Sequence, residues 1–145
     1  MSKKIKIPID VVSLQEDGFH LFIDGAIAGH QVRLLIDTGA SKTVFDKNFI
    51  SEKFPDLKLE TNEQLTTGVG TNTIQSEFTE ISDLSIGNLK LKHYKVAVLD
   101  LMHVNETYST IQLPAIHGVI GCDLLVECKA VINMKKQQLR VKPYK

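Results

Sequence analysis

An aspartate at the end of an apolar strand is the residue of this sequence best suited to chemistry. Asp37 follows an apolar run at 34–36 and is followed by Thr38 and Gly39. An ionisable group in such a position costs free energy unless it is hydrogen-bonded, paired with another charge or needed for function. Gly39 lets the backbone turn sharply and approach another chain or a ligand, and Thr38 supplies a hydroxyl that can hold a neighbouring loop. The tripeptide alone is equally typical of a simple turn after a strand.

The residues around this tripeptide, and two later patterns, favour the chemical interpretation. The sequence around Asp37 reads apolar-apolar-Asp-Thr-Gly-Ala-Ser, which resembles the active-site signature of aspartic peptidases. A Gly-Val-Gly triplet at 68–70 lies where that family carries its flap hairpin, and a Val-Ile-Gly triplet at 119–121 resembles its second signature. From about residue 19 to residue 141 the chain resembles the single-domain, retropepsin-like branch of the family. That resemblance implies a mostly β fold, a small closed β-barrel-like domain with one or two short helices.

The resemblance also assigns roles to individual residues. Asp37 is implied to be the catalytic carboxylate and Thr38 the residue whose hydroxyl links two active-site loops. The remaining implied site residues are the rest of the active-site loop (Gly39, Ala40, Ser41), the flap that closes over substrate (Gly68, Val69, Gly70), and the support beneath the loop (Val119, Ile120, Gly121).

A single Asp-Thr-Gly predicts a homodimer. Aspartic peptidase chemistry uses two carboxylates about 3 Å apart that share one proton, one acting as base on a water and the other as hydrogen-bond donor. Asp24, followed directly by Gly25, lacks the Thr and lies in a predicted hairpin, so we reject it as the second site. We therefore expect the second Asp37 to come from an identical subunit across a two-fold axis.

Three positions depart from the patterns of related enzymes. Ala40 stands where the two-lobed, acid-active relatives carry a hydroxyl that favours the charged carboxylate, so we expect activity nearer neutral pH. Retroviral members usually have Asp at the position of Ser41 and Arg at that of Cys122, and the two form an ion pair. Both charged residues are absent here, so neither is left without its partner. We therefore expect other contacts to support the dimer.

Short strand-like runs dominate the rest of the chain. We predict an edge strand at 5–12, hairpins at 19–36, 84–91 and 131–141, and a further strand at 94–101. Short helices are predicted at 46–54, capped by Asp46 and stopped by Pro55, and at 123–127. The polar segment 103–115 has no clear form. The length of 145 residues fits one domain, residues 1–145.

Composition excludes several classes of function. Lys plus Arg and Asp plus Glu number 17 each, so the formal net charge of zero favours neither nucleic acid nor an anionic membrane as a partner. The two cysteines and five histidines lack metal-ligand spacing, and we expect no metal and no cofactor. We read no signal peptide and no apolar stretch long enough to span a membrane, and we expect a cytoplasmic protein.

Two other functions compete with an endopeptidase that cuts extended peptide or protein substrates. The first is a catalytically silent peptide-binding or assembly module on the same fold, against which the intact Asp37-Thr38-Gly39 argues. The second makes Asp37 a phosphoacceptor on a parallel α/β sheet, against which the lack of alternating helices argues.

Overall fold

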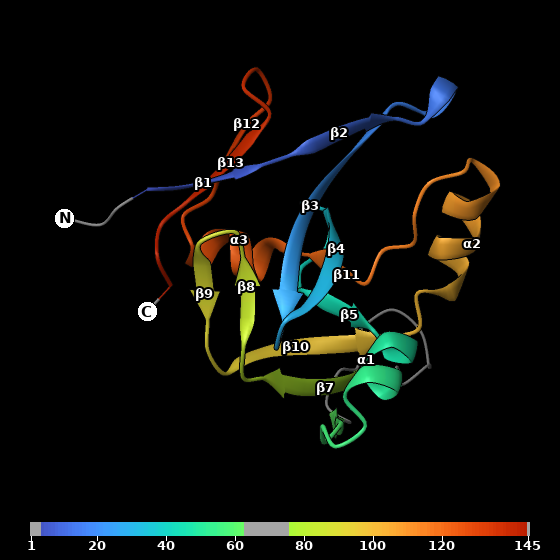
Figure 1. The fold of residues 1–145 in the computed structure, drawn as a ribbon, viewed down its shortest axis with the longest axis vertical. Coiled ribbons are helices and arrows are strands. Elements are labelled where there is room, and N and C mark those ends of the chain that lie inside the picture. The colour runs from blue at the N-terminus through green and yellow to red at the C-terminus, as the bar shows by residue number, and fades with distance from the viewer. Residues whose placement is uncertain (1–3, 63–75, 145) are drawn as a thin grey trace, which may run out of the picture.

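The structure is a computed structural model that describes residues 4–62 and 76–144 (Figure 1). The predicted flap residues 68–70 lie outside the described residues. The strands are β1 (Ile5–Pro8), β2 (Asp10–Ser13), β3 (Phe19–Ile27), β4 (His30–Ile36), β5 (Val44–Asp46), β6 (Glu60–Asn62), β7 (Ser76–Ile81), β8 (Leu84–Ile86), β9 (Leu89–Leu91), β10 (Tyr94–Leu99), β11 (Gly118–Ile120), β12 (Val131–Asn133) and β13 (Gln138–Val141). The helices are the 3-10 turn η1 (Gln15–Asp17), α1 (Lys47–Lys53), α2 (Met102–Thr110) and α3 (Cys122–Glu127).

The mostly β class is confirmed, and the number of helices was underestimated. Helices α1 and α3 match the two predicted short helices, and the Asp46 side chain caps α1 by accepting a hydrogen bond from the Phe49 N–H at 3.4 Å. The segment predicted without a clear form contains a third helix, α2. Tyr108 is the one buried residue of α2, so the helix lacks the repeating apolar face from which it could have been predicted.

The three predicted hairpins are all present, because each has turn chemistry between its strands. Ala28 and Gly29, with φ of 46° and 86°, join β3 to β4. Gly87, with φ of 57°, begins the turn between β8 and β9, and Gln137, with φ of 52°, ends the turn before β13. Positive φ at such positions matches the right-handed twist of the paired strands.

The predicted edge strand at 5–12 is two strands that belong to different sheets. β1 pairs with β13 in a three-stranded sheet of order β1-β13-β12, whereas β2 pairs with β3 in the large sheet. Ile9 lies between them, buried, with its N–H donating to the Gln137 carbonyl at 2.9 Å. The chain therefore changes sheet at one buried residue.

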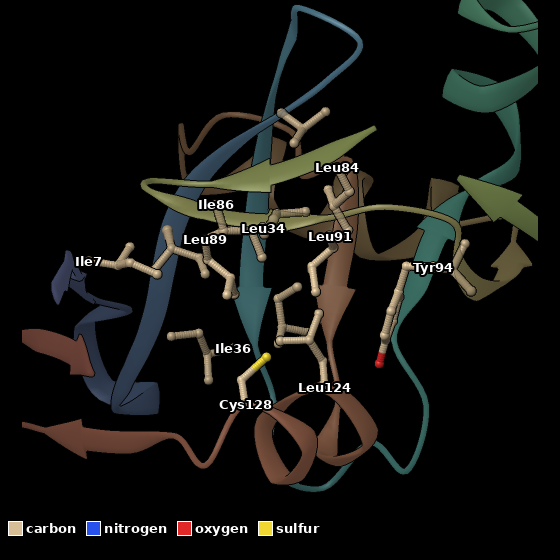
Figure 2. Close-up of a cluster of buried hydrophobic side chains, with 14 of the residues drawn as sticks. Ile7, Leu34, Ile36, Leu84, Ile86, Leu89, Leu91, Tyr94, Leu124 and Cys128 are labelled. Carbon is tan, nitrogen blue, oxygen red and sulfur yellow. The ribbon is translucent and has the colours of Figure 1, made fainter. Parts of the chain in front are cut away.

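The large sheet wraps around a single main core. Its order is β6-β7-β10-β5-β11-β4-β3-β8-β9, and residues of β7, near one end of that order, share one hydrophobic cluster with residues of β8 and β9 at the other end. Figure 2 shows Leu34 and Ile36 of β4 within this cluster, together with Leu124 and Cys128 at the α3 side. No pair between β6 and β9 is present among the described residues, so closure of the barrel stays a prediction.

Candidate active site

Asp37 extends β4 by one residue and lies at the surface. Its N–H donates to the Ile120 carbonyl at 3.0 Å, which continues the parallel ladder between β4 and β11. Its carboxylate Oδ1 accepts the Gly39 N–H at 2.9 Å, and its carbonyl accepts the Ala40 N–H at 3.1 Å. Asp37, Thr38 and Gly39 are exposed, and Ala40 is half-buried. The carboxylate is thus held by its own loop and open to solvent.

The second signature lies directly beside this loop. β11 runs between β4 and β5, with Val119 opposite both Leu35 and Val44 and with Ile120 opposite Ile36. Ile120 is fully buried in the main core, so it anchors the strand that carries the ladder to Asp37. The geometry brings residues 119–121 against the loop, and their supporting role stays a prediction.

Gly121 is the point of closest approach between the two segments. A Cβ at this position would lie 2.5 Å from both the carbonyl carbon and the oxygen of Lys42, and 2.9 Å from the Ala40 oxygen. The next residue, Cys122, donates its N–H to the Ala40 carbonyl at 2.8 Å and its thiol to the Thr38 carbonyl at 3.0 Å. α3 therefore begins against the active-site loop, and a thiol supports the loop where retroviral members place a guanidinium.

A buried network that the sequence did not suggest ties the loop to α3. The Thr43 side chain is fully buried; its N–H and its hydroxyl donate to Asp123 Oδ1 at 2.9 and 2.8 Å. The same hydroxyl accepts the Gly121 N–H at 3.1 Å, and Asp123 Oδ1 also accepts the Leu124 N–H at 2.8 Å. Buried polar groups that are fully paired fix a unique geometry. Thr43 and Asp123 are 80 residues apart, so no local pattern could reveal the pair.

An apolar row crosses four strands on the face from which Asp37 projects. Side chains alternate along β4, so Leu35 and Asp37 lie on the face opposite Leu34 and Ile36. Leu35 is in register with Phe22 on one side and Val119 on the other, and Val119 is in register with Val44. All four pack in a second hydrophobic cluster. This row is the apolar floor beside the carboxylate.

Helix α2 covers one end of this row. Tyr108 is buried; its ring packs edge-on against Phe22 with centroids 5.5 Å apart, and its hydroxyl hydrogen-bonds His20 Nδ1 at 2.8 Å. Asn105 fixes the helix to the chain before β11, donating to the Ile116 carbonyl at 3.0 Å and accepting the Ile116 N–H at 2.8 Å. Burial, and then the negative charge of Asp37, raise the pKa of Tyr108. A lone aromatic in a polar segment was the only sequence signal for this contact.

His117, which lies near the second signature, supports the base of β4. Its Nδ1 accepts the Arg33 N–H at 2.9 Å, and its ring packs against Phe49 of α1 with centroids 4.7 Å apart. Burial lowers the pKa of His117 from its ordinary value of 6.5, and the nearby charge of Asp46 only partly opposes this. A proton on Nδ1 would also break the bond from Arg33.

We expect His117 to make the chain less stable in mild acid. A group whose pKa is lowered by folding contributes stability that is complete above its ordinary pKa and is lost as pH falls through the folded value. As the pH falls below 6.5, the thermal midpoint of the wild type should therefore fall more steeply than that of His117→Asn, whose amide oxygen can still accept the Arg33 N–H.

The matched control is His103→Asn, because the His103 side chain is 91% exposed. Its thermal midpoint should follow the wild-type pH dependence. If the thermal midpoints of the wild type and His117→Asn depended on pH in the same way, His117 would not be the source of the lost stability.

Within residues 4–62 and 76–144, no group of three His, Cys, Asp or Glu side chains is placed to hold a metal ion. No helix in the described part of the chain is both long and apolar enough to cross a bilayer. Both cysteines are free thiols; Cys128 is buried and Cys122 is half-buried.

Comparison with solved structures gives the class of the fold. The chain is similar to the retropepsin-like aspartic protease from Rickettsia conorii, with a TM-score of 0.57, 21% identity, and coverage of 99% of this chain and 92% of that chain. It is also similar to the retroviral protease-like domain of Ddi1 from Leishmania major, with a TM-score of 0.56, 16% identity, and coverage of 87% and 94%. The predicted retropepsin-like fold is therefore confirmed.

The sequence itself gives the family. Residues 23–124 match the sequence profile of aspartyl proteases, a span of more than two thirds of the 145 residues. The chain belongs to the aspartyl protease family. No curated protein sequence matches it significantly.

Proposed function

We propose that this chain is an aspartic endopeptidase that works as a homodimer, with Asp37 of each copy supplying one of the two carboxylates. The observation that carries the proposal is the position of Asp37. It is fixed by the β11 ladder and the Gly39 N–H, yet it is exposed at the surface of one copy. A rigid, solvent-facing carboxylate is what a two-fold pairing of identical loops requires.

The pair of carboxylates would perform general acid and base catalysis on one water. Two carboxylates about 3 Å apart hold one proton between them. The charged carboxylate takes a proton from the water as its oxygen bonds to the peptide carbon, and the neutral one donates a hydrogen bond to the carbonyl oxygen. The C–N bond then breaks as the leaving nitrogen receives a proton. The exposed Thr38 hydroxyl is assigned to the contact between the two loops.

The apolar row predicts part of the substrate. An extended peptide that places its scissile bond at Asp37 would set a neighbouring side chain over Leu35 and Val119, which are half-buried. Apolar contact of this kind favours Leu, Met or Phe beside the bond that is cut. Ser41, exposed in the loop, can donate a hydrogen bond to the substrate backbone. Gly68, Val69 and Gly70 remain the proposed flap.

The direct test incubates the purified chain with a peptide library at several pH values, beside Asp37→Asn. We expect cleavage by the wild type, none by the variant, and inhibition by a statine-type transition-state analogue. Because Ala40 provides no hydroxyl to the carboxylate, the rate should peak nearer neutral pH, and a peak below about pH 4 would contradict that part. If both proteins bind peptides equally and neither cuts them, the chain is a silent peptide-binding module.

A further inference from the structure

Charge is strongly segregated along this chain although its sum is zero. Residues 1–9 and 129–145 hold nine of the 17 Lys and Arg residues and none of the 17 acidic residues. Residues 10–128 therefore carry eight basic and 17 acidic residues. The two basic segments are the ones that pair as β1, β13 and β12 in the small sheet.

Pairing in that sheet gathers the positive charge on one face. In β13, Leu139 and Val141 are buried in the main core, so Gln138 and Arg140 point to the other side. Lys142 directly follows the strand and lines the same groove as Arg140. Arg140 is in register with Lys6 on β1 and with Val131 on β12, so these side chains share the outer face. We call this surface the terminal basic face, made of Lys4, Lys6, Lys129, Val131, Arg140 and Lys142.

The terminal basic face includes a groove and lacks counter-charges. A groove of about 320 Å³ is lined by Lys4, Lys129, Val131, Arg140, Val141 and Lys142. None of these basic side chains forms an ion pair with any described residue. Like charges directly opposite each other, such as Lys6 and Arg140, destabilise a strand pair. This arrangement works against the stability of the sheet, and an acidic partner would relieve it.

Two polar atoms on this face are buried without a partner. Arg140 Nε and Gln138 Oε1, two residues apart on β13, have no hydrogen-bond partner within the described parts of the chain. The Nε–H of an arginine is one arm of the fork that binds a carboxylate, and an amide oxygen accepts a backbone N–H. A donor for a carboxylate beside an acceptor for an N–H suits a peptide better than a free anion.

We propose that the terminal basic face binds an extended acidic segment of a protein, with Glu or Asp carboxylates on Arg140, Lys142 and Lys4. The exposed Val131, with 56% of its surface open, offers apolar contact to the same segment. Acidic peptide is favoured over nucleic acid because no aromatic side chain lines the groove for base stacking. The proposal is independent of Asp37 and of peptidase activity.

The test measures binding of a fluorescein-labelled synthetic peptide in which Glu and Ser alternate, so that its carboxylates share one face of an extended strand. The full chain carrying Asp37→Asn is used, so that no cleavage consumes the probe. We expect binding that weakens with added salt and is lost for the peptide with Gln in place of Glu. The pair Arg140→Gln/Lys142→Gln should weaken binding by at least about tenfold.

The matched control is Lys90→Gln/Lys92→Gln, which removes the same charge from exposed positions in and after β9 and should leave binding unchanged. Should the Arg140/Lys142 variant lose its thermal unfolding transition, Lys4→Gln/Lys6→Gln, at exposed positions just before and within β1, provides the same comparison. Equal binding by control and face variants overturns the proposal, as does the absence of peptide binding. Tighter binding of a single-stranded oligonucleotide or of phosphatidylserine vesicles through Arg140 and Lys142 overturns the choice of a peptide.

Discussion

The Asp37→Asn chain is expected to lose at least about 10³-fold in peptidase turnover while remaining folded, because it removes the general acid and base together. The fold should survive because the side chain is exposed and an amide oxygen can still accept the Gly39 N–H that now reaches Oδ1 at 2.9 Å. Turnover on a cleaved library peptide and the thermal midpoint measure the two effects. A variant that unfolds would leave the chemical role of Asp37 without support.

The same substitution tests whether the two carboxylates come from different copies. When wild type and Asp37→Asn are mixed at fixed total concentration and allowed to exchange subunits, only pairs of wild-type chains keep both carboxylates. Activity should then fall as the square of the wild-type fraction, and dilution of the wild type should lower its specific activity. A linear fall with the wild-type fraction would show that one chain holds a complete site. The mixing control is Lys90→Gln at an exposed position of β9, and mixing it with the wild type should leave the activity unchanged.

Gly121→Ala is expected to destabilise the chain by about 3 kcal/mol or more, or to prevent folding. The added Cβ would lie 2.5 Å from the Lys42 backbone, and neither segment can give way easily. β11 is held in its ladder on one side, and the Thr43–Asp123 network holds the other. Urea unfolding measures the loss, through a lower midpoint at unchanged slope.

Gly39→Ala is the comparison for this prediction. A Cβ on Gly39 meets only the Asp37 carboxylate oxygen at 3.1 Å, at the end of an exposed side chain. We expect less than about 1 kcal/mol of lost stability in that variant. Equal stability of Gly121→Ala and the wild type would mean that the loop and the start of α3 are not packed as described.

The hairpins and the proposed catalytic carboxylate could be predicted from neighbouring residues in the sequence. Contacts between distant segments could not, because no local pattern indicates them. The hairpins at 19–36 and 84–91 were predicted from residues typical of turns, and Ala28, Gly29 and Gly87 adopt positive φ there. The change from one sheet to the other at Ile9 could not be predicted, because residues 5–12 form a single interrupted apolar run in the sequence.

The supports of the site depend on contacts between distant segments. In the sequence Thr43 looks like an ordinary loop residue. Only the structure shows that its hydroxyl donates a hydrogen bond to Asp123, 80 positions later. Helix α2 was missed because a helix that buries only Tyr108 has no apolar periodicity to detect. The sequence therefore identified the reacting group, and only the structure showed what holds it.

The exposure of Asp37 in a single copy has a consequence for how assembly responds to acidity. Each copy brings one solvent-exposed Asp37 carboxylate, so pairing two copies would place two like-charged groups side by side at the two-fold axis. In the proposed dimer the two groups share one proton, so each association event at neutral pH must capture a hydrogen ion from water. Mass action then makes the pairing of subunits weaker as the medium becomes more alkaline, by up to about tenfold per pH unit.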